Sequence, residues 1–139
     1  MNNITLTPTM VAATVVPDSQ RLDFLPRHFR NWTATFESAV YMHLRDLCAD
    51  YTGSYWQFFD LSNGGCYMAP DLGQFPMLAP NDYEGTVDAD TAGIIATLYA
   101  LSHLSFAHPN AEVFAEHFHA LREFALDHPS TEAIFAAID

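Results

Sequence analysis

The chain has 139 residues, and half of them are apolar, which is enough for one domain with a hydrophobic core and too few for two domains. Its 17 acidic residues face only five basic ones, all of them arginine, for a formal net charge of −12. Binding to nucleic-acid phosphates or to an anionic membrane depends on clustered Lys and Arg, so we expect neither direct nucleic-acid binding nor a membrane partner.

An acidic chain could instead imitate DNA, which requires carboxylates at phosphate-like intervals along an extended face. The densest acidic group here is Asp82, Glu84, Asp88 and Asp90, and the other acids are scattered singly along the sequence. Charged residues make up only 16% of the chain. We therefore interpret the acidity as an ordinary solvated face that keeps the protein soluble.

Several features indicate a cytoplasmic protein. The N-terminus lacks a basic segment and carries Pro8 where a secretory signal has an uninterrupted apolar run. Cys48 and Cys66 do not form a CxxC motif, so we expect two reduced thiols. The most apolar run, 92–106, is shorter than the roughly 20 residues that a membrane helix needs, and polar residues interrupt it. It is typical of a buried helix.

The first elements along the chain are short. Residues 1–15 are expected to be a flexible N-terminal segment, with a short strand at Met10–Val16. Asp18 or Ser19 is a suitable N-cap for a helical turn, which Pro26 is expected to stop.

A long helix is predicted from Thr33 to Asp50, because apolar residues recur at steps of three and four. The following stretch, Tyr51–Pro70, carries six aromatic residues around an Asn63-Gly64-Gly65 turn. Asn and Gly accept the positive φ of tight turns, so Ser54–Leu61 and Cys66–Ala69 are predicted to form a β-hairpin packed by its aromatic side chains.

The second half of the chain is predicted to contain a loop, one strand and three helices. The loop spans Pro70–Asp82 and the strand Tyr83–Val87. Asp88 is a favourable N-cap for a central helix at Ala89–Leu104, with Asp90 in its first turn. The last two helices are expected at 110–127 and, after Ser130 as N-cap, at Thr131–Ile138. The predicted fold is one α+β domain over 1–139, with three to four helices around a small antiparallel sheet that contains the Ser54–Ala69 hairpin.

We expect no metal and no cofactor. Glu116 and His119 have the i, i+3 spacing that diiron bundles use, but the second such pair is missing and both residues fall on the polar side of their helix. His117 lies nearer the apolar stripe and is interpreted as a packing residue. The seven histidines show neither HExxH nor a paired Cys/His spacing, so the sequence does not predict zinc.

Signatures of a nucleophile or a phosphate loop are also missing. Ser62 lies outside any GxSxG motif, and Cys66 has no context that activates a thiol. Composition therefore favours a non-catalytic binding protein over an enzyme. The alternative is an enzyme with a site near the hairpin, which would require a pocket that gathers Tyr51, Asp60, Asn63 and a histidine.

The pattern Tyr51-x-Gly53-x-x-Trp56-x-Phe58, followed by the string LSNGG-x-YMAP, resembles the ArdB/KlcA antirestriction family, with ArdB expected to be nearest. Further matches, such as Tyr83-Glu84-Gly85, extend the resemblance over roughly residues 15–139. One departure is Cys66, where the family usually has phenylalanine.

The resemblance implies a small cytoplasmic α+β protein of plasmids or other mobile elements that protects incoming DNA from host type I restriction enzymes. It implies a mechanism other than DNA mimicry. The expected partner is the type I restriction enzyme or an associated host factor, and the oligomeric state stays open. The candidate interaction surface consists of Asn63, Gly64, Gly65, Asp82, Glu84, Asp88 and Asp90.

Overall fold

The hairpin around Asn63 forms most of a three-stranded antiparallel sheet in the computed structural model, which describes residues 10–139. Strand β2 (Trp56–Leu61) pairs with β3 (Cys66–Pro70) on one side and with β1 (Ala13–Val15) on the other. Strand β1 confirms the strand predicted near the N-terminus. Of the flexible segment predicted over residues 1–15, residues 1–9 lie outside the described residues, and Ala13–Val15 form β1.

A second sheet consists of β4 (Gln74–Leu78) and β5 (Glu84–Asp88), which pair antiparallel. Strand β5 was predicted, but the prediction of a loop throughout Pro70–Asp82 is wrong because β4 lies inside it. In β4 buried residues alternate with exposed ones, as in a strand that covers a core with one face. Pro76 weakens this pattern in the sequence, yet a two-stranded sheet has only edge strands, where proline is tolerated.

Helices α1 (Arg21–Phe29) and α2 (Thr33–Leu47) follow β1, and a 3-10 turn precedes each of them. The prediction that Pro26 stops the first helix is wrong, since α1 continues through it to Phe29. Pro26 cannot donate to the Leu22 carbonyl, but Leu22 is 93% exposed, so water can replace that bond. Burial of Phe29 favours the extra turn of helix.

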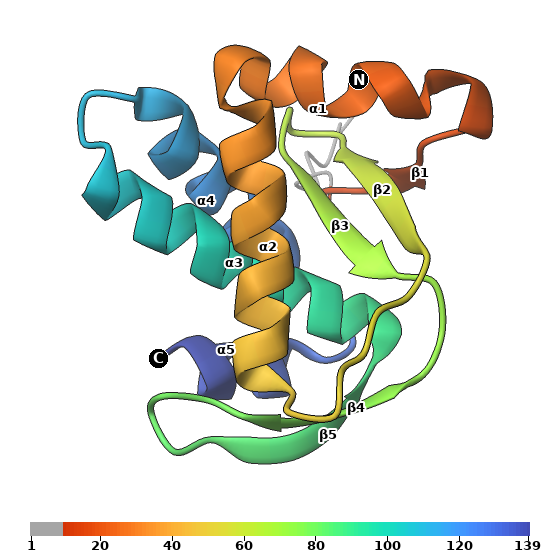
Figure 1. The fold of residues 1–139 in the computed structure, drawn as a ribbon, viewed down its shortest axis with the longest axis vertical. Helices are drawn as coiled ribbons and strands as arrows, with labels where there is room; N and C mark the ends of the chain where they lie inside the picture. The colour runs from red at the N-terminus through yellow and green to blue at the C-terminus, as the bar shows by residue number, and fades with distance from the viewer. Residues whose placement is uncertain (1–9) are drawn as a thin grey trace, which may run out of the picture.

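Helix α3 (Ala89–Ala107) lies at the centre of the molecule, where it packs against α2, β3, α4 (Glu112–Leu126) and α5 (Thr131–Ile138) (Figure 1). As predicted, Asp88 caps α3: its carboxylate accepts a hydrogen bond of 2.8 Å from the Thr91 N–H. Gly93 allows α3 to approach β3 closely, because a Cβ atom there would lie 2.2 Å from the Cβ of Ala69.

The predicted class is confirmed as an α+β fold in which helices pack against small antiparallel sheets. The core combines buried aromatic residues of α1, α2 and β2 with the aliphatic residues of α3. Within residues 10–139, no helix is both long enough and apolar enough to cross a membrane.

Candidate functional site

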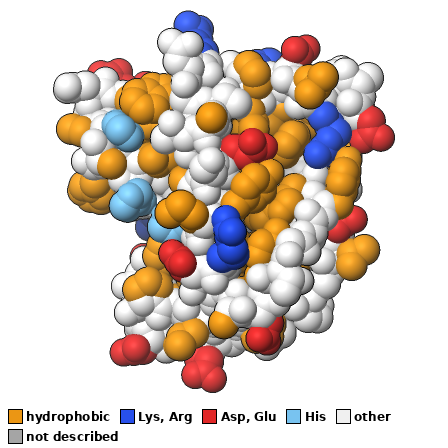
Figure 2. All heavy atoms as spheres, in the orientation of Figure 1, with side chains coloured by type: hydrophobic (Ala, Val, Ile, Leu, Met, Phe, Trp, Pro, Cys, Tyr) orange, Lys and Arg blue, Asp and Glu red, His pale blue; other side chains and the backbone are white. Residues whose placement is uncertain are grey.

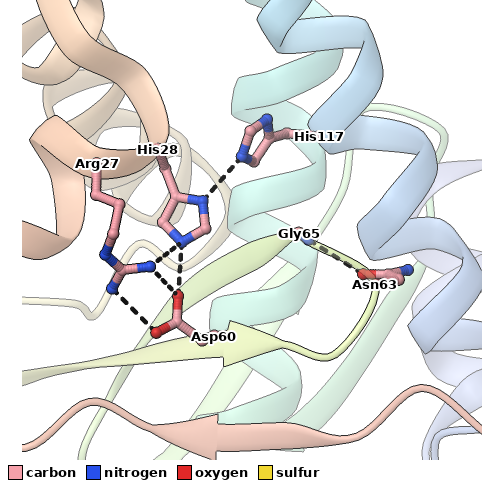
Figure 3. Close-up of polar contacts among 6 residues, drawn as sticks. All are labelled: Arg27, His28, Asp60, Asn63, Gly65 and His117. Carbon is pink, nitrogen blue, oxygen red and sulfur yellow. Dashed lines mark hydrogen bonds and ion pairs between the residues drawn. The ribbon is translucent and has the colours of Figure 1, made fainter.

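Five polar side chains meet where α1 and α4 approach the turn between β2 and β3. Helix α1 contributes Arg27 and His28, and α4 contributes His117. Asp60 lies next to the end of β2 and pairs with Cys66, the first residue of β3. We call these five residues the Asp60 cluster; Figure 3 shows Arg27, His28, Asp60 and His117 pointing toward one another.

Asp60 is the anionic centre of this cluster. Arg27 binds both of its oxygens, at 3.1 and 3.0 Å, and His28 Nε2 lies 2.6 Å from Oδ1. Burial opposes ionisation, but the hydrogen bonds from Arg27 and His28 outweigh it and hold the pKa of Asp60 below its ordinary value. Because the carboxylate is ionised, the short contact needs a proton on His28 Nε2. The longer Arg27–Nε2 contact of 3.4 Å is then no hydrogen bond.

The two histidines face each other through their remaining nitrogens, with His28 Nδ1 3.1 Å from His117 Nε2. His117 Nδ1 lies 3.0 Å from the Val113 carbonyl oxygen, which can only accept, so this nitrogen carries the proton. Burial lowers the pKa of both rings below the ordinary value for histidine, despite the hydrogen bonds that raise it.

Cys66 forms the buried floor of the cluster, with none of its surface exposed. Burial raises the pKa of its thiol well above the ordinary value. One ring nitrogen each of His28 and His117 and the Cys66 sulfur lie within 4.8 Å of one another. These three atoms are therefore close enough to share one metal ion.

The sequence does not show this arrangement, since it favours a structural Cys66 and a packing His117 and places His28 in no motif. The three residues come from α1, β3 and α4, and no short motif links them. Only the packing of the two helices on the hairpin brings them together, so no local spacing could have shown the cluster.

A second polar cluster joins β3, α3 and the loop between α4 and α5; we call Tyr67, Asp90, His128 and Ser130 the Asp90 cluster. The Tyr67 hydroxyl donates to Asp90 Oδ1 at 2.6 Å, and His128 Nε2 lies 2.8 Å from Oδ2. The Ser130 N–H donates to His128 Nδ1 at 3.0 Å. Burial disfavours the charge of Asp90, but the hydrogen bonds from His128 and Tyr67 outweigh it, so the pKa of Asp90 is lowered.

The turn residues of the predicted interaction surface lie against α4. The Asn63 side chain donates to the Ala120 carbonyl at 2.9 Å and to Glu123 Oε1 at 2.8 Å, and accepts from the Gly65 N–H. Gly65 is buried, and a Cβ atom there would lie 2.7 Å from the Cβ of Ala120. Asn63 and Gly64 are exposed, but the turn also holds the sheet to α4.

The acidic residues of that surface have different roles. Asp82 and Glu84 are exposed on the β4–β5 hairpin, where Asp82 takes a positive φ of 71° in the turn. Asp88 caps α3, and Asp90 belongs to the second cluster. Figure 1 shows the β2–β3 turn at the top of the molecule and the β4–β5 hairpin at the bottom, so the structure does not bring the two parts together.

The carboxylates are also dispersed in space on the face that carries α2. Figure 2 shows acidic side chains scattered singly over this face, most of them near its rim, rather than in a row. A DNA mimic needs a ladder of charges along one face. The face in view does not present such a ladder.

The pocket required for the enzyme alternative does not form as expected. Tyr51 accepts a hydrogen bond of 2.8 Å from Trp56 Nε1 and lines a pocket of about 320 Å³ together with Tyr41. Asp60 lies at the opposite end of β2 from Trp56, and Asn63 is bound to α4. Of the four predicted groups, only Asp60 and a histidine come together.

The fold and its two clusters define a small, acidic α+β domain in which paired carboxylates and histidines join helices to an antiparallel sheet. Comparison with known proteins places it more narrowly, because the family model described as antirestriction protein matches residues 49–139. The chain belongs to this antirestriction protein family.

Relatives of the whole chain agree with this assignment. Two Escherichia coli proteins named antirestriction protein KlcA are 42% and 38% identical to it over 135 and 140 residues. These matches cover 93% and 95% of this chain and 95% and 96% of the relatives. A solved structure, reported for the KlcA and ArdB proteins, superposes with a TM-score of 0.89 at 41% identity over all of both chains.

Proposed function

We propose that this protein protects incoming mobile-element DNA from type I restriction systems inside the cell. The observation that carries the proposal is likeness over the whole chain to a solved structure from work that describes antirestriction activity of KlcA and ArdB against type I DNA restriction systems in vivo but not in vitro. An identity of 41% over the full length of both chains supports a shared activity, and not only a shared fold. That this chain is more similar to ArdB than to KlcA stays a prediction.

We further propose that protection is non-catalytic and does not proceed by DNA mimicry. Two of the four carboxylates in the densest acidic group serve the fold, one as a helix cap and one in the Asp90 cluster. The contrast between activity in vivo and in vitro in the relatives favours a route through a host factor over direct blockade of the restriction enzyme. That route fits a cytoplasmic protein.

The part of the predicted interaction surface best suited to a partner is the β4–β5 hairpin. Asp82 and Glu84 are exposed there, and among the described residues they form hydrogen bonds only through the backbone, with their carboxylates left free. Neutral variants at these two positions can therefore test a contact without disturbing the core. Asp88 and Asp90 are unsuitable for this purpose, because their loss would affect the fold.

The test is the plating efficiency of unmodified phage on cells with an active type I system, with and without the protein. We expect the wild type to restore plating and the double variant Asp82→Asn, Glu84→Gln to restore it less. The matched control, Glu112→Gln with Glu116→Gln, makes the same charge change on the exposed face of α4. Failure of the wild type to restore plating would contradict the function, whereas equal protection by both variants would contradict only the surface.

A pull-down from the same cells identifies the partner. We expect a host factor to be retained by the wild type and lost in the hairpin variant; a restriction subunit would indicate direct docking instead.

The enzyme alternative rests on the Asp60 cluster alone. It would be favoured if incubation with the purified chain changed the mass of a restriction subunit.

A further inference from the structure

One contact in the Asp60 cluster, between His28 and His117, cannot be a hydrogen bond while both rings are neutral. His28 donates through Nε2 to Asp60, and His117 donates through Nδ1 to the Val113 carbonyl. A neutral imidazole has only one N–H, so His28 Nδ1 and His117 Nε2 are both acceptors. These two lone pairs point at each other across 3.1 Å. Such an arrangement requires a cation between them, either a proton or a metal ion.

We infer that His28 Nδ1, His117 Nε2 and the Cys66 sulfur form a binding site for a divalent transition metal such as Zn²⁺. This goes beyond the proposed function and departs from the absence of a metal site that the sequence predicts. Two imidazole nitrogens and one thiolate are the donor set that zinc prefers, and magnesium and calcium, which take oxygen ligands, would bind poorly.

The separations of the ligand atoms can be compared with those of a tetrahedral zinc site. Bond lengths of about 2.0 to 2.3 Å imply that ligand atoms around zinc lie about 3.3 to 3.6 Å apart. The two nitrogens are already 3.1 Å apart, and the sulfur lies no more than 4.8 Å from a ring nitrogen of each histidine. The sulfur must approach the two rings by up to about 1.2 Å to complete the site. The fourth position is left for water or an outside ligand.

The surrounding hydrogen bonds match those that support metal-binding histidines. A ligating imidazole usually donates its other N–H to a carboxylate or a backbone carbonyl, which fixes the tautomer. His28 donates to Asp60 and His117 to Val113, so each ring has one of these two partners. Arg27 in turn holds Asp60 in place through two hydrogen bonds. The metal would join α1, β3 and α4.

Titration of the untagged, reduced protein with Co²⁺ tests the site, because cobalt bound to a thiolate gives an intense charge-transfer band and tetrahedral cobalt gives visible bands. We expect one equivalent to bind with both signals. Cys66→Ser should abolish the charge-transfer band, and His117→Gln should weaken Co²⁺ binding by at least about tenfold. His119→Gln, an exposed histidine on the same helix, should behave like the wild type.

Circular dichroism spectra establish that each variant is folded. If Cys66→Ser does not fold, His117→Gln at its half-buried position decides the question. The inference is overturned if the wild type gives no charge-transfer band, which would leave a shared proton between the rings. It is also overturned if the band survives Cys66→Ser, or if His117→Gln binds Co²⁺ as tightly as the wild type does.

Discussion

The Asp60 and Asp90 clusters have the same central feature, an aspartate paired with a buried histidine, but they differ in how completely their hydrogen bonds are satisfied. In the Asp90 cluster the carboxylate accepts from Tyr67 and His128, and His128 accepts in turn from the Ser130 N–H. Every ring nitrogen has a complementary partner when His128 is neutral. In the Asp60 cluster two acceptor nitrogens face each other instead.

This difference separates a structural role from a binding role. Buried polar groups in folded proteins almost always have partners, so an unsatisfied pair indicates a missing ion, proton or ligand. The Asp90 cluster needs nothing further and joins β3 to α3 and to the loop before α5. The Asp60 cluster becomes complete only when a cation lies between its two rings.

The largest effect is expected from Gly93→Ala, which disturbs the strand that both clusters share. The added methyl group would lie 2.2 Å from the Cβ and 2.4 Å from the Cα of Ala69, so α3 must move away from β3. We expect a loss of about 3 kcal/mol in the free energy of unfolding, together with weaker Co²⁺ binding. Chemical denaturation measures the first and the cobalt titration the second. A variant as stable as the wild type would contradict the close packing of α3 on β3.

The next effect is expected from Asp90→Asn, which breaks the complete cluster. The amide cannot accept from both Tyr67 and His128, so one donor loses its partner. Because the Asp90 side chain is 40% exposed, we expect a loss of about 1 to 2 kcal/mol in the free energy of unfolding. Co²⁺ affinity should stay unchanged. A change in that affinity would show that the two clusters are coupled.

Low pH should narrow the difference between Asp90→Asn and the wild type. The folded pKa of Asp90 is lowered relative to its unfolded value of 3.8, so its contribution to stability is present above that value. It is lost as the pH falls from about 4 through the folded pKa. Thermal unfolding of both proteins between pH 7 and pH 3 measures this. A difference in stability between Asp90→Asn and the wild type that stays constant over this pH range would contradict the lowered pKa of Asp90.

Asp60→Asn should have the opposite profile, with little effect on stability and a clear effect on metal affinity. Arg27 and Asp60 have side chains that are 46% and 34% exposed, and the asparagine oxygen can still accept from His28 Nε2, so we expect a loss of no more than about 1 kcal/mol in the free energy of unfolding. Loss of the charge that supports His28 should weaken Co²⁺ binding by about 10- to 100-fold. The free energy of unfolding and the Co²⁺ affinity, measured on one preparation, are then compared with those of Asp90→Asn. Unchanged Co²⁺ affinity would remove Asp60 from the site.

The smallest effect on stability is expected from Asp82→Asn with Glu84→Gln on the β4–β5 hairpin. Both residues are exposed, and asparagine tolerates the positive φ of Asp82. We expect the free energy of unfolding to change by no more than about 0.5 kcal/mol, so any loss of phage protection would report a lost contact. A large loss of stability would make the plating result uninformative about the partner and would contradict the exposed position of the pair.

Local chemistry predicted the features that depend on neighbouring residues. Asn63 and the two glycines after it defined the hairpin, and Asp88 defined the start of α3, because turns and caps are set within a few residues. Pro26 was misleading, because burial of Phe29 outweighed a single lost hydrogen bond. Strand β4 was missed because Pro76 interrupts a short run whose pairing with β5 is not visible locally. The Asp60 cluster could not be predicted, because its histidines and cysteine meet only through tertiary packing.

The difference between the two clusters is tested most directly by X-ray absorption at the zinc edge on protein loaded with one equivalent of Zn²⁺. Our interpretation predicts a first coordination shell with one sulfur at about 2.3 Å and two imidazole nitrogens at about 2.0 to 2.1 Å. In Cys66→Ser the sulfur should disappear, while Asp90→Asn should give the wild-type spectrum. A first shell of nitrogen and oxygen alone in the wild-type protein would contradict a zinc site that includes Cys66.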